Sequence, residues 1–149
     1  MGGSYNGEVE QLDTVHLSPV GDFPGAGAQI RTIQFSTEGR LMLATSDDQS
    51  LQLYDVDSRT MLGDPLHSSA PFNANQQVNI ANGWLRPDGK AIAVNQGDGV
   101  AVWSLDPNQL MAAACAFAGR NLTPSEWHSY LGDSTVYRKT CPSFGAPND

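Results

Sequence analysis

The stretch from Ile30 to Asp57, IRTIQFSTEGRLMLATSDDQSLQLYDVD, decides the fold. It predicts three short strands joined by two tight turns. In residues 30–36 successive side chains are expected to point to opposite faces, as in a strand. Residues 41–45 form the continuous apolar run that is typical of a strand buried on both faces. Residues 51–55 alternate again, while the polar stretches 37–40 and 46–50 supply the turns.

The same pattern returns between Val78 and Asp106, VNIANGWLRPDGKAIAVNQGDGVAVWSLD. In its first turn Pro87 presets φ, and Gly89 accepts the positive φ that a tight hairpin needs. A weaker copy lies at residues 8–14. The spacing is 42 residues from Asp13 to Asp55 and 49 residues from Asp55 to Ser104, and such periods of short strands indicate propeller blades.

These repeats predict an all-β fold, a partial β-propeller of about two and a half blades, with a C-terminal helical hairpin. We expect propeller blades over residues 1–106, divided into a partial blade at 1–29 and blades at 30–77 and 78–106, and a helical extension at 107–149. Outer strands are expected at 15–17 and 61–66, and the Pro/Gly/Ala-rich residues 18–29 are expected to form a linker. The predicted buried side chains are Leu43, Leu53, Ile92, Val94 and Val102.

The repeats resemble WD-repeats. One copy is Phe35 to Leu41 with Ser46-Asp47-Asp48 and Leu51 to Asp55; a second is Trp84 to Lys90 with Gly97 to Val100 and Val102-Trp103-Ser104. The Trp-Asp pair of the family reads Tyr54-Asp55 in one copy and Trp103-Ser104 in the other, and the Gly-His pair is missing. The resemblance covers about residues 8–106 and implies a propeller that serves as an interaction scaffold.

The period changes after Asp106, where two helices are expected. Asp106 is an N-cap followed by Pro at the first helical position, and Gly119 is the stop signal. Thr123 begins a second helix with Pro124 and a capping Glu126, and that helix is expected to end at Gly132.

The tail has a resemblance of its own, carried by about residues 103–142. The matching residues are Asp106-Pro107, Ala114-Cys115, Ala118 to Thr123, Glu126-Trp127, Tyr130, Tyr137-Arg138 and Thr140-Cys141-Pro142. They resemble the C-terminal extension of large bacterial proteins that join a STAND-type NTPase, or another signalling domain, to a WD-repeat propeller. The chain has no NTPase motif, so the resemblance implies the last blades and the closing tail of such a protein, without nucleotide chemistry.

Composition narrows the classes of partner. The chain has 149 residues and a net charge of −8. This charge argues against binding to nucleic acid phosphates or to an anionic membrane, because both need a basic face on the protein. No apolar run has the length of a transmembrane helix, and the N-terminus has neither the basic nor the apolar part of a signal peptide. Because the signal-peptide pattern is missing and two cysteines are too few for a disulfide scaffold, we expect a cytoplasmic protein. The negative charge and the lack of a long apolar run lead us to expect that it binds neither nucleic acid nor membrane.

The candidate residues for catalysis or metal binding are scattered along the chain. His16, His67 and His128 have no metal-ligand spacing, and no nucleophile motif appears. The turn acids Asp47, Asp48 and Asp98 could bind a cation, although turn aspartates usually accept hydrogen bonds from their own backbone. We therefore predict no catalytic, cofactor-binding or metal-binding residues.

The tail offers the other candidates. Arg120 and Asn121 either contact a partner or hydrogen-bond the propeller and orient the second helix. Trp127 and Tyr130 either anchor the tail against the last blade or form an exposed hot spot. Cys115 and Cys141 either form a bridge across 26 residues or remain two separate buried thiols.

The expected function is a non-catalytic protein–protein interaction scaffold or sensor module, like the propeller end of a bacterial signalling protein, which binds a protein partner or associates with itself. The first alternative is a structural piece that completes another chain's propeller. The second is an enzyme that uses the propeller channel. Such an enzyme would need converging acids or a His near the ends of the inner strands, whereas these strands offer Arg31, Thr32, Gln34, Asn79 and Asn82 instead.

Overall fold

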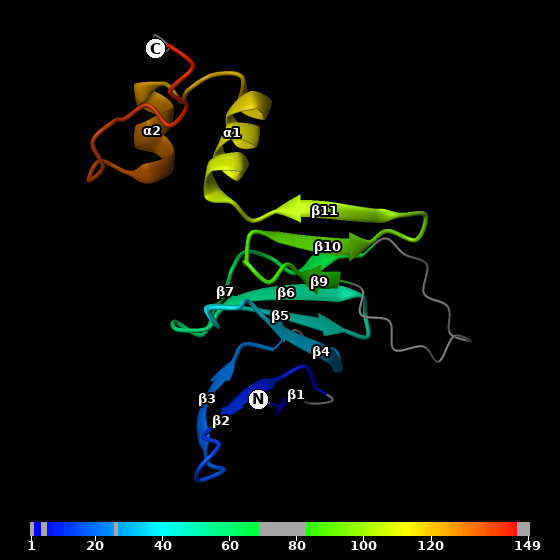
Figure 1. Ribbon diagram of the computed structural model, residues 1–149. Coiled ribbons are helices and arrows are strands. Elements are labelled where there is room, and N and C mark those ends of the chain that lie inside the picture. Colours follow the sequence, from blue (N-terminus) through cyan, green and yellow to red (C-terminus); the bar gives the residue numbers. More distant parts are fainter. Residues whose placement is uncertain (1, 4–5, 26, 69–82, 146–149) are drawn as a thin grey trace. The chain divides into compact units, whose positions relative to one another are not determined.

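The computed structural model describes residues 2–3, 6–25, 27–68 and 83–145 (Figure 1). Its contacts divide the chain into two compact units, Met1–Ser104 and Leu105–Asp149. The first unit consists of three antiparallel sheets, and the second consists of two helices and the segment that follows them. The chain is therefore mostly β-structure followed by a C-terminal helix pair.

The three sheets follow one another along the sequence. The first has the order β1-β2-β3, with β1 at Gly2–Gly3, β2 at Val9–Leu12 and β3 at Pro19–Phe23. The second contains β4 (Ile30–Phe35), β5 (Leu41–Ser46) and β6 (Ser50–Asp55), and both β7 (Thr60–Met61) and β8 (Leu66–His67) pair with β6. The third has the order β11-β10-β9, with β9 at Gly83–Leu85, β10 at Ala91–Asn95 and β11 at Val100–Ser104.

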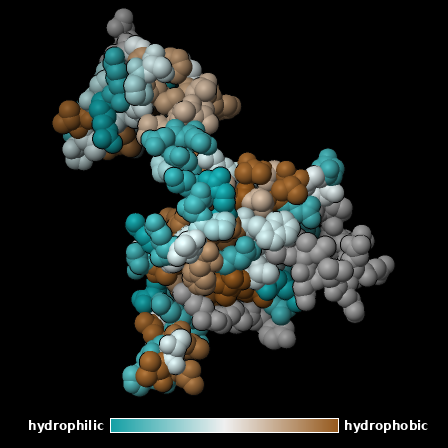
Figure 2. Space-filling model, viewed as in Figure 1, coloured by the Kyte–Doolittle hydropathy of each residue, from teal (hydrophilic) through white to brown (hydrophobic). Residues whose placement is uncertain are grey.

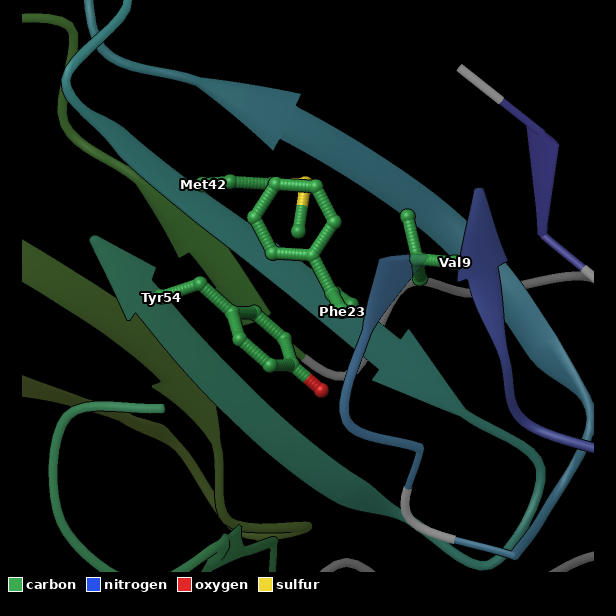
Figure 3. Close-up of a cluster of buried hydrophobic side chains, with 5 residues drawn as sticks. Val9, Phe23, Met42 and Tyr54 are labelled. Atoms are coloured by element: carbon green, nitrogen blue, oxygen red, sulfur yellow. The ribbon is translucent and has the colours of Figure 1, made fainter. Parts of the chain in front are cut away.

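One core lies between the first two sheets (Figure 3). Its buried members are Val9, Phe23, Met42, Ala44 and Tyr54. Met42 and Tyr54 are opposite each other in the β5–β6 register, so both point to the same face. The Phe23 and Tyr54 rings meet edge to face at 5.5 Å, and the buried Tyr54 hydroxyl donates to the Pro24 carbonyl at 2.7 Å.

The opposite face of the second sheet packs against the third. Leu43 lies opposite Leu53, both are buried, and fully buried Leu51 is on the same face. An added Cβ on Gly83 would come within 2.1 Å of the Leu51 Cδ2 atom, so the two sheets approach closely at this point. Since β5 packs on both faces, the continuous apolar run predicted for residues 41–45 is confirmed.

Hydrogen bonds from side chains and from one backbone N–H also join the second and third sheets. Gln34 on β4 donates from Nε2 to the Gly83 carbonyl at 2.9 Å and accepts from the Leu85 N–H at 3.1 Å, so it continues the backbone pattern of β9. The Thr37 N–H donates to the Pro87 carbonyl at 2.7 Å, and Ser68 donates to the Asn95 carbonyl.

Two expected outer strands are wrong. Residues 14–16 form a turn, and β3 lies inside the stretch that was expected to be a linker. Residues 61–66 do not form one strand, because the chain leaves β6 at Gly63, which has φ +79°, and returns as β8. Glycine and proline thus mark the bends correctly, but they do not exclude a strand between them.

The helices form where their caps predict. In α1 (Pro107–Ala118) the Asp106 side chain accepts from the Asn108 N–H, and Gly119 ends the helix at φ +69°. In α2 (Pro124–Leu131) Thr123 and Glu126 complete a capping box, and Gly132 follows the last turn. Both sets of predicted boundaries are confirmed.

A disulfide and one asparagine hold the helical unit together. Cys115 and Cys141 are bonded, with their Cα atoms 5.5 Å apart. Of the 12 residues of α1, Cys115 alone is buried, so the disulfide is the helix's main attachment to the rest of its unit. The two helices make few direct contacts with each other.

Candidate interaction surfaces

The outer face of the third sheet carries exposed apolar side chains. Trp84, Ala93 and Val102 lie opposite one another across β9, β10 and β11, so all three point to one face. Val100 is two residues from Val102 on the same face. Trp84 is 44%, Val100 63% and Val102 69% exposed. We call Trp84, Ala93, Val100 and Val102 the outer face; Figure 2 shows apolar side chains gathered over β11.

The other face of the same sheet is closed. Leu85, Ile92 and Val94 alternate with the outer-face residues and are buried on the side of the second sheet. Burial of Leu43, Leu53, Ile92 and Val94 is confirmed, whereas the predicted burial of Val102 is wrong. Its register partner is Ala93, so Val102 and the buried Val94 point to opposite faces of the sheet.

The third sheet also has an edge, on β11, that no other described strand pairs with. In the second sheet β6 is followed by β7 and β8, whereas among the described residues β11 pairs only with β10. An apolar face next to a strand edge that lacks a described partner is a surface on which another strand or sheet can add.

The first sheet presents a different surface at the other end of the strand unit. Val9 and Phe23 point into the core, so their neighbours Glu10 and Asp22 point away from it. Glu10 and Asp22 are directly opposite in the register, and this like-charged pair makes that end acidic.

Asn121 organises the helical unit and is 1% exposed. Its Oδ1 accepts from the Thr140 and Cys141 N–H groups at 3.1 and 2.8 Å. Its Nδ2 donates to the carbonyls of Cys141, Phe144 and Gly145, each at 3.1 Å. These bonds show that Asn121 fixes the returning segment of its own unit, a role that the sequence did not reveal.

Arg120 pairs with the capping residue of α2. Its guanidinium donates to the two Glu126 carboxylate oxygens at 2.6 and 2.7 Å. This contact, aided by the Thr123 N–H, lowers the pKa of Glu126 from 4.5 to about 2. The expectation that Arg120 orients the second helix is thereby confirmed, whereas the expected bonds to the propeller are replaced by bonds of Arg120 and Asn121 to residues of their own unit.

Trp127 and Tyr130 have different environments. Trp127 is buried, its ring meets that of Tyr137 at 5.6 Å, and its Nε1 donates to the Thr135 carbonyl at 3.1 Å. Tyr130 is 72% exposed and therefore does not act as an anchor, and the buried Trp127 makes these contacts within its own unit rather than with the last blade.

The turn acids Asp47 and Asp48 already have partners close to them in the structure. Asp47 forms an ion pair with Arg31, and Asp48 accepts from the Ser50 N–H at 3.0 Å in the same turn. His16 pairs with Asp13, and His128 pairs with Asp133 at 2.7 Å. In the part of the chain that the structure describes, no three His, Cys, Asp or Glu side chains are placed to hold one metal ion.

The polar residues of the inner strands take part in local contacts. Arg31 pairs with Asp47, the Thr32 hydroxyl is 2.8 Å from that of Thr45, and Gln34 binds β9. Val78, Asn79 and Asn82, where the last blade was expected to begin, lie outside the described residues. None of the described helices is long and apolar enough to cross a membrane.

Comparison with known proteins supports a propeller-like fold of the WD-repeat kind. No protein-family model matches the chain. The SIR4-interacting protein SIF2 of Saccharomyces cerevisiae, a WD-repeat protein, is 28% identical over 119 residues, which cover 76% of this chain and 21% of SIF2. The structure of dihydro-heme d1 dehydrogenase NirN in complex with DHE aligns with a TM-score of 0.51 and 23% identity, over 68% of this chain and 20% of that one. The chain thus spans about a fifth of the length of each.

Proposed function

We propose that this chain is a non-catalytic protein-interaction module, a run of propeller blades whose outer face binds another protein surface. The observation that carries the proposal is the exposure of Trp84, Val100 and Val102 on one face of the last sheet. Burial of these apolar side chains by a partner is favourable, and Trp is among the residues that most often dominate the binding energy of an interface. The similarity to SIF2, whose name describes it as interacting with SIR4, supports a role in protein contact.

A closely related function is the completion of another chain's propeller. The observation that favours it is the contrast between β6, which has outer partners, and β11, which pairs only with β10 in the described part of the chain. A strand or blade from a second chain would satisfy both the edge of β11 and the outer face. The resemblance of the tail supports an origin at the end of a bacterial signalling protein, where the module would act as a scaffold or sensor in the cytoplasm.

The test uses the chain itself as the first partner. The Val102→Lys substitution places a charge on the outer face, whereas Val136→Lys places the same charge at a residue that is 90% exposed in the other unit. We expect the unmodified chain and the Val136→Lys variant to associate in sedimentation velocity experiments, and the Val102→Lys variant to remain monomeric. A parent chain that stays monomeric at high concentration would argue against the outer face as an adhesive surface.

A further inference from the structure

A cavity of about 870 Å³ lies within the helical unit, between α1 and the segment that returns after α2. Met111, Ala114 and Ala118 line it from α1, and Leu122 lines it from the connection between the helices. Arg138 and Lys139 line the other side, on the returning segment. We call this cavity the tail groove. Its two walls are separated in the sequence by the whole of α2 (Figure 1).

The tail groove is preformed. The Cys115–Cys141 disulfide joins its two walls, and both cysteines line it. The five hydrogen bonds of the buried Asn121 described above fix the returning segment on the second wall. A ligand that enters would therefore not have to order the walls, and this lowers the entropic cost of binding.

The charge of the tail groove is positive although the chain is acidic. Three cationic side chains line the tail groove: Arg120, Arg138 and Lys139. Arg120 is paired with Glu126, whereas Arg138 and Lys139 form no ion pair with any described residue. Of the carboxylates nearby in sequence, Asp133 pairs with His128 and Asp106 caps α1. Apolar side chains beside two cations that pair with no described carboxylate suit a ligand that has an apolar part and carboxylates.

We propose that the tail groove binds a short segment of a partner protein in which apolar side chains are flanked by Asp or Glu. The volume lies within the range of ligand sites and exceeds what a single side chain fills. The apolar side chains would pack on Met111, Ala114 and Ala118, while the carboxylates meet Arg138 and Lys139. This inference rests on the proposed role in protein interaction and assigns it a second, separate surface.

The test is fluorescence anisotropy with three matched peptides and the full, oxidised chain. Each labelled peptide has leucine pairs that alternate with pairs of glutamate, glutamine or lysine. We expect the glutamate peptide to bind at least about threefold more tightly than the glutamine peptide, because exposed charge pairs contribute modestly, and the lysine peptide to bind weakest. The preference should shrink as salt is raised.

Variants locate the site. Ala114→Trp fills the tail groove from an exposed position of α1, and Ala113→Trp is its control because Ala113 does not line the cavity. We expect Ala114→Trp to weaken the glutamate peptide by about tenfold or more, as the loss of a central pocket does, and Ala113→Trp to leave it unchanged. Removing both cations with Arg138→Gln and Lys139→Gln should abolish the preference for glutamate, whereas Arg40→Gln with Lys90→Gln, the same charge change in the other unit, should not.

Two results would overturn the proposal: no difference between the glutamate and lysine peptides, or equal binding by Ala113→Trp and Ala114→Trp chains. Failure of this proposal is distinguishable from failure of the proposed function. The tail-groove variants leave the outer face intact, so they should sediment like the parent chain, and Val102→Lys should not alter peptide binding.

Discussion

Gly83 lies where two sheets come closest. It begins β9, its backbone carbonyl accepts from Gln34, and it faces the fully buried Leu51. A methyl group at this position would come within 2.1 Å of the Leu51 Cδ2 atom, and a side chain enclosed in a core cannot move away without cost.

We therefore expect Gly83→Ala to lower the free energy of unfolding by about 1–3 kcal/mol. Gly99 is the matched control, since an added Cβ there meets no atom within 4 Å. Urea denaturation of the two variants measures the difference. If both substitutions had the same small effect, the sheets would not be packed as closely as the structure shows.

Asn121 is a second position where a single atom matters, because it needs both an acceptor and a donor. Asn121→Asp keeps the acceptor for Thr140 and Cys141 but sets a carboxylate against the carbonyls of Cys141, Phe144 and Gly145. We expect a loss of about 1–3 kcal/mol or more in the helical unit, since a buried polar group loses its partners. Hydrogen exchange of residues 140–145 should rise in the variant. Unchanged protection would mean that the bonds to Nδ2 contribute little.

At the scale of elements, α2 depends on pH through its cap. The pKa of Glu126 is about 2 in the folded chain against 4.5 for the free side chain, so the ionised form is favoured by folding. Its contribution to stability is complete above pH 4.5 and is lost as the pH falls toward 2. Thermal unfolding should therefore show a smaller decline over this window for Glu126→Gln than for the parent chain; parallel declines would exclude Glu126 as the source.

The attachment of α1 depends on the disulfide. Closing a 26-residue span stabilises a chain by about 2–4 kcal/mol on a loop-entropy estimate, and α1 has no other buried side chain to replace that contribution. We expect no free thiol in the denatured, unreduced chain, and a faster exchange of the α1 amides in the Cys115→Ser, Cys141→Ser variant. Two titratable thiols per chain would contradict the bridge.

The sequence predicted these elements unevenly, and the reasons are physical. Helix caps are local, so Asp106 and Thr123 were sufficient to place both helices. Strand pairing is not local. Pro19 and Gly21 are residue types that are typical of a linker, and only their pairing with β2 makes this segment a strand, so β3 was missed. The face of Val102 follows from its register with Ala93, which no single strand reveals.

The disulfide could not be decided from spacing, because it depends on where the segment after α2 returns. The role of Asn121 depends on the same return, so it was equally hidden. The expectation of a cytoplasmic location relied on two cysteines being too few for a disulfide scaffold, and their pairing weakens that argument.

At the scale of the whole molecule, the strand unit has two ends that do not match. One end is the apolar outer face; the other carries Glu10 opposite Asp22. Joining unlike ends in series would bury those carboxylates against apolar side chains, which is costly without partners of opposite charge. Pairing two outer faces removes apolar surface from water on both copies.

Pairing of like faces has a consequence in symmetry. When a surface binds the same surface of a second copy, the two copies are related by a two-fold axis. Both surfaces are then buried, so the assembly is closed as a dimer. We expect sedimentation velocity experiments at rising concentration to show monomers giving way to dimers, with no larger species. A series of trimers and longer species would mean instead that unlike ends join, and that the chain can build a ring or a filament from copies of itself.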